Sequence, residues 1–165
     1  MTMATKAGLL GMWRIDRRIV DALGPDAHFI GNIIIRQTEG TLDTLTLTEG
    51  GYLKIGDQSP VPANRAYSWV FHRPTFVEAL FSDGRPFHNI DLATANPKAL
   101  HECPPDIYRV AYDFRMPDEW RSTWTVTGPR KDYVMTSTMT RPRGWKDRKP
   151  TPKGPLPKFE ITQFA

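Results

Sequence analysis

The sequence contains a single cysteine, Cys103, and has no apolar run near the ~20 residues that a membrane-spanning helix needs. One cysteine excludes an internal disulfide framework and a four-cysteine zinc cluster. The first ten residues also lack the apolar segment of a secretory signal. We therefore expect a cytoplasmic protein without membrane insertion. With 165 residues, the chain is long enough for one domain with a proper core.

Excess positive charge is absent from most of the chain, although the net charge is +4. Residues 142–165 contain six Lys or Arg and two Asp or Glu, which accounts for the whole net charge. They also contain five of the fifteen prolines, which disfavour a regular helix or a central strand. We predict a folded domain over residues 1–141 and an extended basic, proline-rich tail over 142–165, packed on the domain or trailing from it. The neutral body argues against a nucleic-acid partner, since such proteins carry a basic folded face.

Helical periodicity is nearly absent, and apolar and polar residues alternate with a period of two instead. Gly50-Gly51 and Asp83-Gly84 have the composition of hairpin turns, and residues 93–105 are predicted to form a long loop. The strands expected from this pattern are residues 11–21, 28–37, 44–48, 52–55, 64–72, 75–82, 86–92, 106–115, 119–127 and 131–141.

Short connections between these strands predict an all-β, antiparallel up-and-down sheet of about nine or ten strands. Such a sheet must close on itself or cover its edges. Closure into a barrel is the simpler solution, and a barrel of this size holds side chains and one small ligand. A two-sheet sandwich is the alternative.

Gly11-Met12-Trp13 at the start of the first strand resembles the glycine-x-tryptophan opening of the calycins, which are lipocalin-like barrels. The resemblance implies that Trp13 plugs one end of the barrel. It also implies that a basic side chain from the last strand covers the tryptophan by a cation–π contact, with Arg141 favoured over Lys131.

A second resemblance is to an uncharacterised family of small bacterial and fungal proteins, known only as a domain of unknown function. It covers residues 11–141 and rests on Gly11, Trp13 and Arg17, on Gly84-Arg85-Pro86-Phe87-His88, on His101-x-Cys103-x-x-Asp106-x-Tyr108, and on Trp124 to Tyr133. It implies a calycin-like barrel. Haem is not expected, because Asp16 and Arg17 stand where haem-binding relatives of the barrel are glycine-rich.

Four polar residues in the middle of the chain are candidates for acid–base chemistry: His88, His101, Asp106 and Tyr108. A histidine would move a proton, Asp106 would orient the imidazole, and Tyr108 would donate to a developing oxyanion. This pattern suits a cofactor-independent isomerase, cyclase or lyase. The alternatives are hydrogen-bonded groups that only fasten the loop, a metal site formed by His101, Cys103 and Asp106 with His88, and a Cys103 nucleophile.

Aromatic residues are more numerous than a small barrel needs to fill its core. We expect a subset of them, with Arg17 or Arg121, to line a cavity for one small, largely apolar or aromatic molecule. A non-catalytic carrier would have the same cavity, and a homodimer is possible in either case. The candidate ligand-binding residues are Trp13, Arg17, Tyr67, Trp69, Phe87, Tyr112, Arg121 and Trp124.

Overall fold

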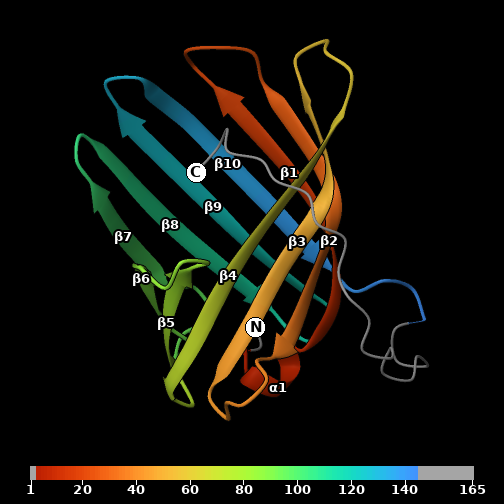
Figure 1. Ribbon diagram of the computed structural model, residues 1–165, viewed down its shortest axis with the longest axis vertical. Helices are drawn as coiled ribbons and strands as arrows, with labels where there is room; N and C mark the ends of the chain where they lie inside the picture. Colours follow the sequence, from red (N-terminus) through yellow and green to blue (C-terminus); the bar gives the residue numbers. More distant parts are fainter. Residues whose placement is uncertain (1–2, 145–165) are drawn as a thin grey trace.

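The computed structural model describes residues 3–144, which form ten antiparallel strands and one short helix (Figure 1). The prediction for the tail therefore falls almost entirely outside the described residues. No helix in the described part is long and apolar enough to cross a membrane. The elements are α1 (Lys6–Leu9), β1 (Gly11–Asp21), β2 (Ala27–Gln37), β3 (Thr44–Ile55), β4 (Val61–Arg73), β5 (Phe76–Phe81), β6 (Pro86–Asp91), β7 (Lys98–Cys103), β8 (Asp106–Arg115), β9 (Glu119–Gly128) and β10 (Lys131–Thr140).

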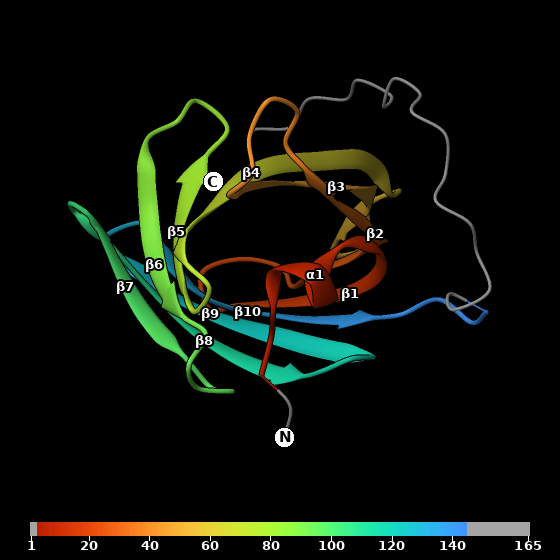
Figure 2. The same cartoon turned by 90° about the horizontal axis from the view of Figure 1, so that it is seen from below.

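All ten strands belong to one sheet, whose order is β6-β5-β4-β3-β2-β1-β10-β9-β8-β7. Every strand except β6 and β7 has two hydrogen-bonded neighbours, and the ladder between β1 and β10 joins the two ends of the chain. Figure 2 shows the sheet curling round to bring β6 and β7 to the same side. The prediction of an all-β antiparallel barrel is confirmed, and the barrel is nearly closed.

Alternation of side chains decides which residues face inward, as β1 illustrates. Trp13, Ile15 and Arg17 are buried, whereas Arg14 and Asp16 between them are exposed. Because the side-chain period of a strand is two, a shift of one residue would bring the charged side chains into the core. The apolar pattern therefore fixes the register of β1.

The predicted hairpin turn at Gly50-Gly51 is wrong, because both glycines lie inside β3. Gly51 is paired with Gly31 of β2 in the sheet register. A Cβ at Gly51 would overlap the carbonyl oxygen of Ile30, and one at Gly31 would overlap that of Gly50. These glycines let two backbones approach closely in a curved wall, which is the other common use of glycine in a strand.

The predicted loop over residues 93–105 is also wrong in part, because β7 forms there and pairs with β8. His101 and Cys103 are therefore strand residues. The strand was missed because it lies at the edge of the sheet and is mostly exposed, so its sequence has no apolar face. The number of strands still agrees with the prediction, since residues 44–48 and 52–55 belong to a single strand.

One end of the barrel is closed by α1, which Figure 2 shows lying across it. Trp13 is fully buried beneath this helix and donates from Nε1 to the carbonyl oxygen of Leu9 at 2.9 Å. The Arg141 guanidinium lies 3.6 Å from the centre of the Trp13 ring and donates to the carbonyl oxygens of Gly8 and Leu10. The predicted cation–π cover of the tryptophan by Arg141 is confirmed, so this end is a plug.

Candidate functional site

Two adjoining hollows lie inside the barrel and share Arg17, Glu49, Arg65 and Met135 in their walls. The first, which we call the aromatic hollow, contains about 520 Å³ of space free of protein atoms, its opening included. The second, the side hollow, contains about 430 Å³ measured in the same way. Aromatic side chains dominate the walls of the aromatic hollow, namely Tyr67, Trp69, Phe87, Tyr112, Trp120 and Trp124.

The aromatic wall is held in shape by ring stacking. Phe87 stacks on Trp124, with ring centres 4.9 Å apart and planes 14° apart, and on Phe81 at 4.2 Å. Trp69 meets Tyr112 edge to face at 6.1 Å. Contacts of these kinds add stability beyond the burial of apolar area. The stacked rings therefore give the aromatic hollow an ordered, apolar wall.

A β-bulge brings both Phe87 and His88 into this wall. Ala79 of β5 pairs with His88, whereas the next residue, Leu80, pairs with Pro86, so Phe87 is the extra residue in β6. An extra residue re-aims the side chains around it. Strict alternation along β6 would place Phe87 and His88 on opposite faces, whereas with the bulge both residues line the aromatic hollow.

His88 is buried and hydrogen-bonded through Nε2 to the Tyr112 hydroxyl at 2.8 Å. Burial, with a smaller contribution from the charge of His101, lowers the pKa of His88 to about 3. Burial also raises the pKa of Tyr112 far above its ordinary value. At neutral pH both groups are therefore uncharged. Within the described part of the chain, His88 Nδ1 and Trp120 Nε1 are buried atoms without a hydrogen-bond partner.

The neutral state of His88 predicts a specific sensitivity to acid. In the unfolded chain, His88 takes up a proton below its ordinary pKa of 6.5. In the folded protein, His88 stays unprotonated until the pH falls to about 3. Stability therefore falls as pH decreases through this window, and this residue alone contributes a loss of about 2 kcal/mol by pH 5. Urea unfolding at pH 7 and pH 5 should show a smaller loss in His88→Gln than in the wild type.

The control is His28→Gln, since the His28 ring lies on the outer face, beside Asp16. This variant should keep the acid sensitivity that His88 causes. Equal losses between pH 7 and pH 5 in the wild type and His88→Gln would contradict the prediction.

The charged part of the wall is centred on Arg17. Its guanidinium donates to both carboxylate oxygens of Glu49, at 2.8 Å each, and to the Ser137 hydroxyl at 2.7 Å. Burial alone raises the pKa of Glu49, but the charge and hydrogen bonds of Arg17, with the charge of Arg65, outweigh burial and lower it. Glu49 is therefore ionised, and the buried pair is a fully formed salt bridge.

Arg65 and Tyr67 follow on β4, where Arg65 donates to the Tyr67 hydroxyl at 3.0 Å. Burial lowers the pKa of Arg65, whereas Tyr67 and Glu49 raise it, and the net shift is upward. Arg65 therefore remains a cation beside the Arg17–Glu49 pair.

The other three candidate catalytic residues form a separate cluster. Asp106 and Tyr108 lie at the start of β8, beside Lys131 at the start of β10, and His101 lies on the neighbouring strand β7. Lys131 donates to the Tyr108 hydroxyl at 2.7 Å and lies 3.1 Å from the Asp106 carboxylate. Its hydrogen bond to Tyr108, with that to Asp106, raises the pKa of Lys131 above its ordinary range. His101 lies among the rings of Phe81, Phe87 and Tyr108.

The predicted arrangement, in which Asp106 orients an imidazole, is therefore wrong. Asp106 forms its ion pair with Lys131, and His88 is oriented by Tyr112. The four candidate catalytic residues are divided between the aromatic hollow and the cluster around Lys131. His88 lines the aromatic hollow, where it is hydrogen-bonded to Tyr112.

A family described as "Family of unknown function (DUF6314)" matches residues 9–141, most of the chain. The chain belongs to this family. No curated protein matches the sequence significantly.

Two solved structures resemble the DUF6314 barrel at low sequence identity. The S-type phycobiliprotein lyase CPES from Guillardia theta aligns with a TM-score of 0.62 and 10% identity, over 84% of this chain and 90% of the lyase chain. A protein of unknown function from the DUF3598 family of Nostoc punctiforme aligns with a TM-score of 0.53 and 12% identity, over 85% of this chain but only 49% of the other. At such identities the likeness concerns the fold alone.

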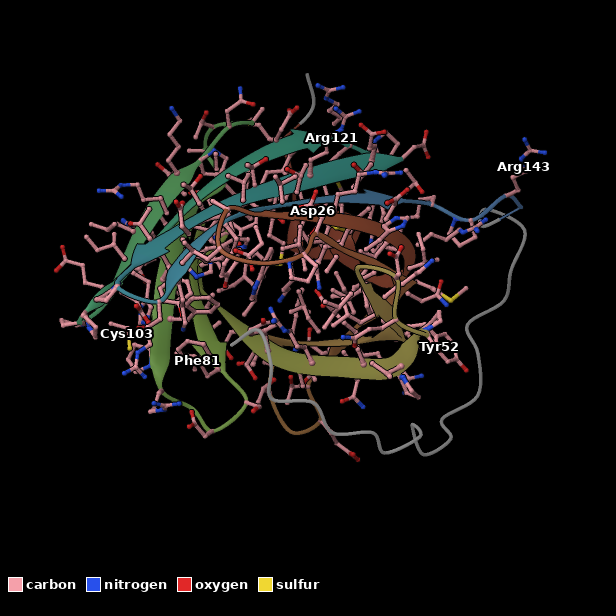
Figure 3. All side chains as sticks on the ribbon, turned by 90° about the horizontal axis from the view of Figure 1, so that it is seen from above. Asp26, Tyr52, Phe81, Cys103, Arg121 and Arg143 are labelled. Carbon is pink, nitrogen blue, oxygen red and sulfur yellow. The ribbon has the colours of Figure 1, made fainter. Side chains whose placement is uncertain are left out.

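Six of the eight candidate ligand-binding residues line the aromatic hollow of this DUF6314 barrel: Arg17, Tyr67, Trp69, Phe87, Tyr112 and Trp124. Trp13 does not, since it forms the plug under Arg141. Arg121 does not either, because it alternates with the buried Trp120 and Ser122 and so points outward (Figure 3). Its Nε donates to Glu119 at 2.9 Å on the outer surface.

The metal and nucleophile alternatives find no support in the geometry. Cys103 is exposed and lies at the outside of the barrel (Figure 3). In residues 3–144, no three side chains of His, Cys, Asp and Glu gather where they could hold a metal ion. His101, Cys103 and Asp106 therefore do not form the metal site that their spacing suggested.

Residues that sequence reasoning missed include Glu49, Arg65 and Ser137. Glu49 continues the inward series of Leu45 and Leu47, so alternation alone would have placed it inside if Gly50-Gly51 had not been interpreted as a turn. Arg65 shares a strand face with Tyr67 and Trp69. For the buried Ser137, no signal in the sequence indicated that it would face Arg17.

Proposed function

We propose that the protein binds one small, largely apolar or aromatic organic molecule in the aromatic hollow. The observation that carries this proposal is that the wall combines stacked aromatic rings with two buried nitrogens, His88 Nδ1 and Trp120 Nε1, that lack partners among the described residues. Buried polar atoms are nearly always hydrogen-bonded, so orphaned ones beside a hollow favour an occupant with a polar group.

Filling part of the hollow should weaken binding without changing the outer surface. Ser122 is buried in the wall of the aromatic hollow, so Ser122→Leu places a larger side chain there. We expect the wild type to bind the neutral arene 2-naphthamide at a one-to-one ratio, and Ser122→Leu to bind it at least about tenfold more weakly. The readout is quenching of tryptophan fluorescence, since Trp69, Trp120 and Trp124 line the hollow.

The matched control is Thr123→Leu, the next residue of β9, which lies on the opposite face of the strand. This variant adds the same side chain outside the barrel and should bind as the wild type does. The proposal fails if the folded wild type shows no saturable binding, or if both variants bind equally well.

A cofactor-independent acid–base enzyme acting on the bound molecule is the second candidate, and the His88–Tyr112 pair favours it. Because the pKa of His88 is about 3, this pair would act at neutral pH as a neutral hydrogen-bonding group. A neutral imidazole is able to polarise a carbonyl group, but it is a weak base when its pKa lies so far below the working pH. If a compound that binds in the hollow is recovered chemically unchanged after incubation, the enzyme proposal fails for that compound and the protein is a carrier.

A further inference from the structure

The charges inside the barrel do not balance. Arg17, Glu49 and Arg65 all line both hollows, and together they contribute two positive charges and one negative charge. Glu49 binds Arg17 through both carboxylate oxygens, so its capacity for a second arginine is largely used.

Arg65 is the cation left over. It is half-buried at the junction of the two hollows, and within residues 3–144 no carboxylate lies within ion-pair distance of it. Its hydrogen bond goes to the hydroxyl of Tyr67. A partly desolvated cation of this kind is costly unless an anion approaches it.

Neighbouring groups do not supply that anion. The one carboxylate in the adjacent cluster, Asp106, already faces Lys131. Tyr133 lies near Arg65 and Tyr108, but burial raises its pKa, so it is a phenol and not a phenolate at neutral pH. The walls around Arg65 therefore leave one positive charge for an occupant to neutralise.

We infer that the natural ligand is an aromatic monoanion of the arene carboxylate type. Its carboxylate binds the Arg65 guanidinium, and its ring lies against the stacked wall of Phe87 and Trp124. The planar fork of arginine matches a carboxylate in shape and charge. This inference rests on the proposed function and adds the charge and chemical class of the ligand to it.

The test compares two ligands of the same size and shape, 2-naphthoate and 2-naphthamide, which differ in a single negative charge. Isothermal titration calorimetry at pH 7.5 on the full chain should give at least about tenfold tighter binding of naphthoate, the range expected for a hydrogen bond to a charged group. Arg65→Met should remove this preference, because naphthoate loses a charged partner and naphthamide does not. Arg65→Lys should retain part of the preference, because the charge remains.

The matched control is Arg109→Met, which removes an exposed arginine from the outer face of β8 and should leave both affinities unchanged. Near-ultraviolet circular dichroism of each variant checks that the barrel is folded. Equal affinities of the wild type for the two ligands would overturn the assignment of an anion while leaving the proposed function intact. A preference that survives in Arg65→Met would overturn the role of Arg65. If neither ligand binds the folded wild type, the proposed function fails and this inference fails with it.

Discussion

Replacing Gly51 with alanine is expected to destabilise the barrel by about 3 kcal/mol or more, or to prevent folding. The new Cβ would overlap the carbonyl oxygen of Ile30 and would lie 2.5 Å from the Cα atom of Gly31. Both obstacles are backbone atoms of β2, so no side-chain rotation can relieve the clash. Urea unfolding followed by circular dichroism measures the loss.

The neighbouring glycine is a built-in control for this prediction. A Cβ at Gly50 would meet no atom within 4 Å. Gly50→Ala should therefore change the free energy of unfolding by less than about 1 kcal/mol, with a contribution in the stabilising direction from the lower entropy of the unfolded chain. Similar losses in both variants would show that close approach of β2 and β3 is not what requires glycine.

The second large effect concerns the buried salt bridge. Glu49→Leu removes the carboxylate and leaves the Arg17 guanidinium in the interior with the Ser137 hydroxyl as a hydrogen-bond partner and the Arg65 cation in the same wall. Breaking one side of a buried ion pair commonly costs about 3–5 kcal/mol, because the remaining charge stays desolvated. Chemical unfolding at pH 7 should show a loss in this range.

Removing both charges should restore much of that loss. In Arg17→Met combined with Glu49→Leu, no ion is left in the pair, and well-packed apolar replacements of buried ion pairs are often close to neutral. The loss of stability in the double variant should therefore be much smaller than the sum of the losses in the two single variants. If the losses of the two single variants simply add, the pair does not act as a unit, and the prediction is wrong.

The two glycines show why the strand pattern predicted so much and still misplaced a turn. A glycine pair is typical of a hairpin turn, but it is also what a curved wall needs where two backbones touch. The choice between these uses depends on which residue of another strand lies opposite, and here Gly31, twenty residues away, decides it. That information is absent from residues 44–55 themselves.

The strand pattern likewise predicted some residues of the site and missed others. Alternation along single strands was enough to bring Arg17, Tyr67, Trp69 and Trp124 to the interior. It failed at Phe87, where a bulge between β5 and β6 adds a residue to one strand. It also said nothing about partners, so Asp106 was predicted to orient an imidazole and instead faces Lys131.

By itself, the sequence determined the class of the fold, most of the strands and the aromatic character of the interior. These features follow from local chemistry: a period-two pattern, turn residues, and the burial of apolar surface. The tryptophan plug with Arg141 above it was implied by the resemblance to the calycins. Tertiary structure alone decided that Glu49 binds Arg17, that His88 binds Tyr112, and that Arg65 is the cation left over. Pairing of polar side chains depends on the curvature and stagger of the closed sheet, and those are properties of all ten strands together.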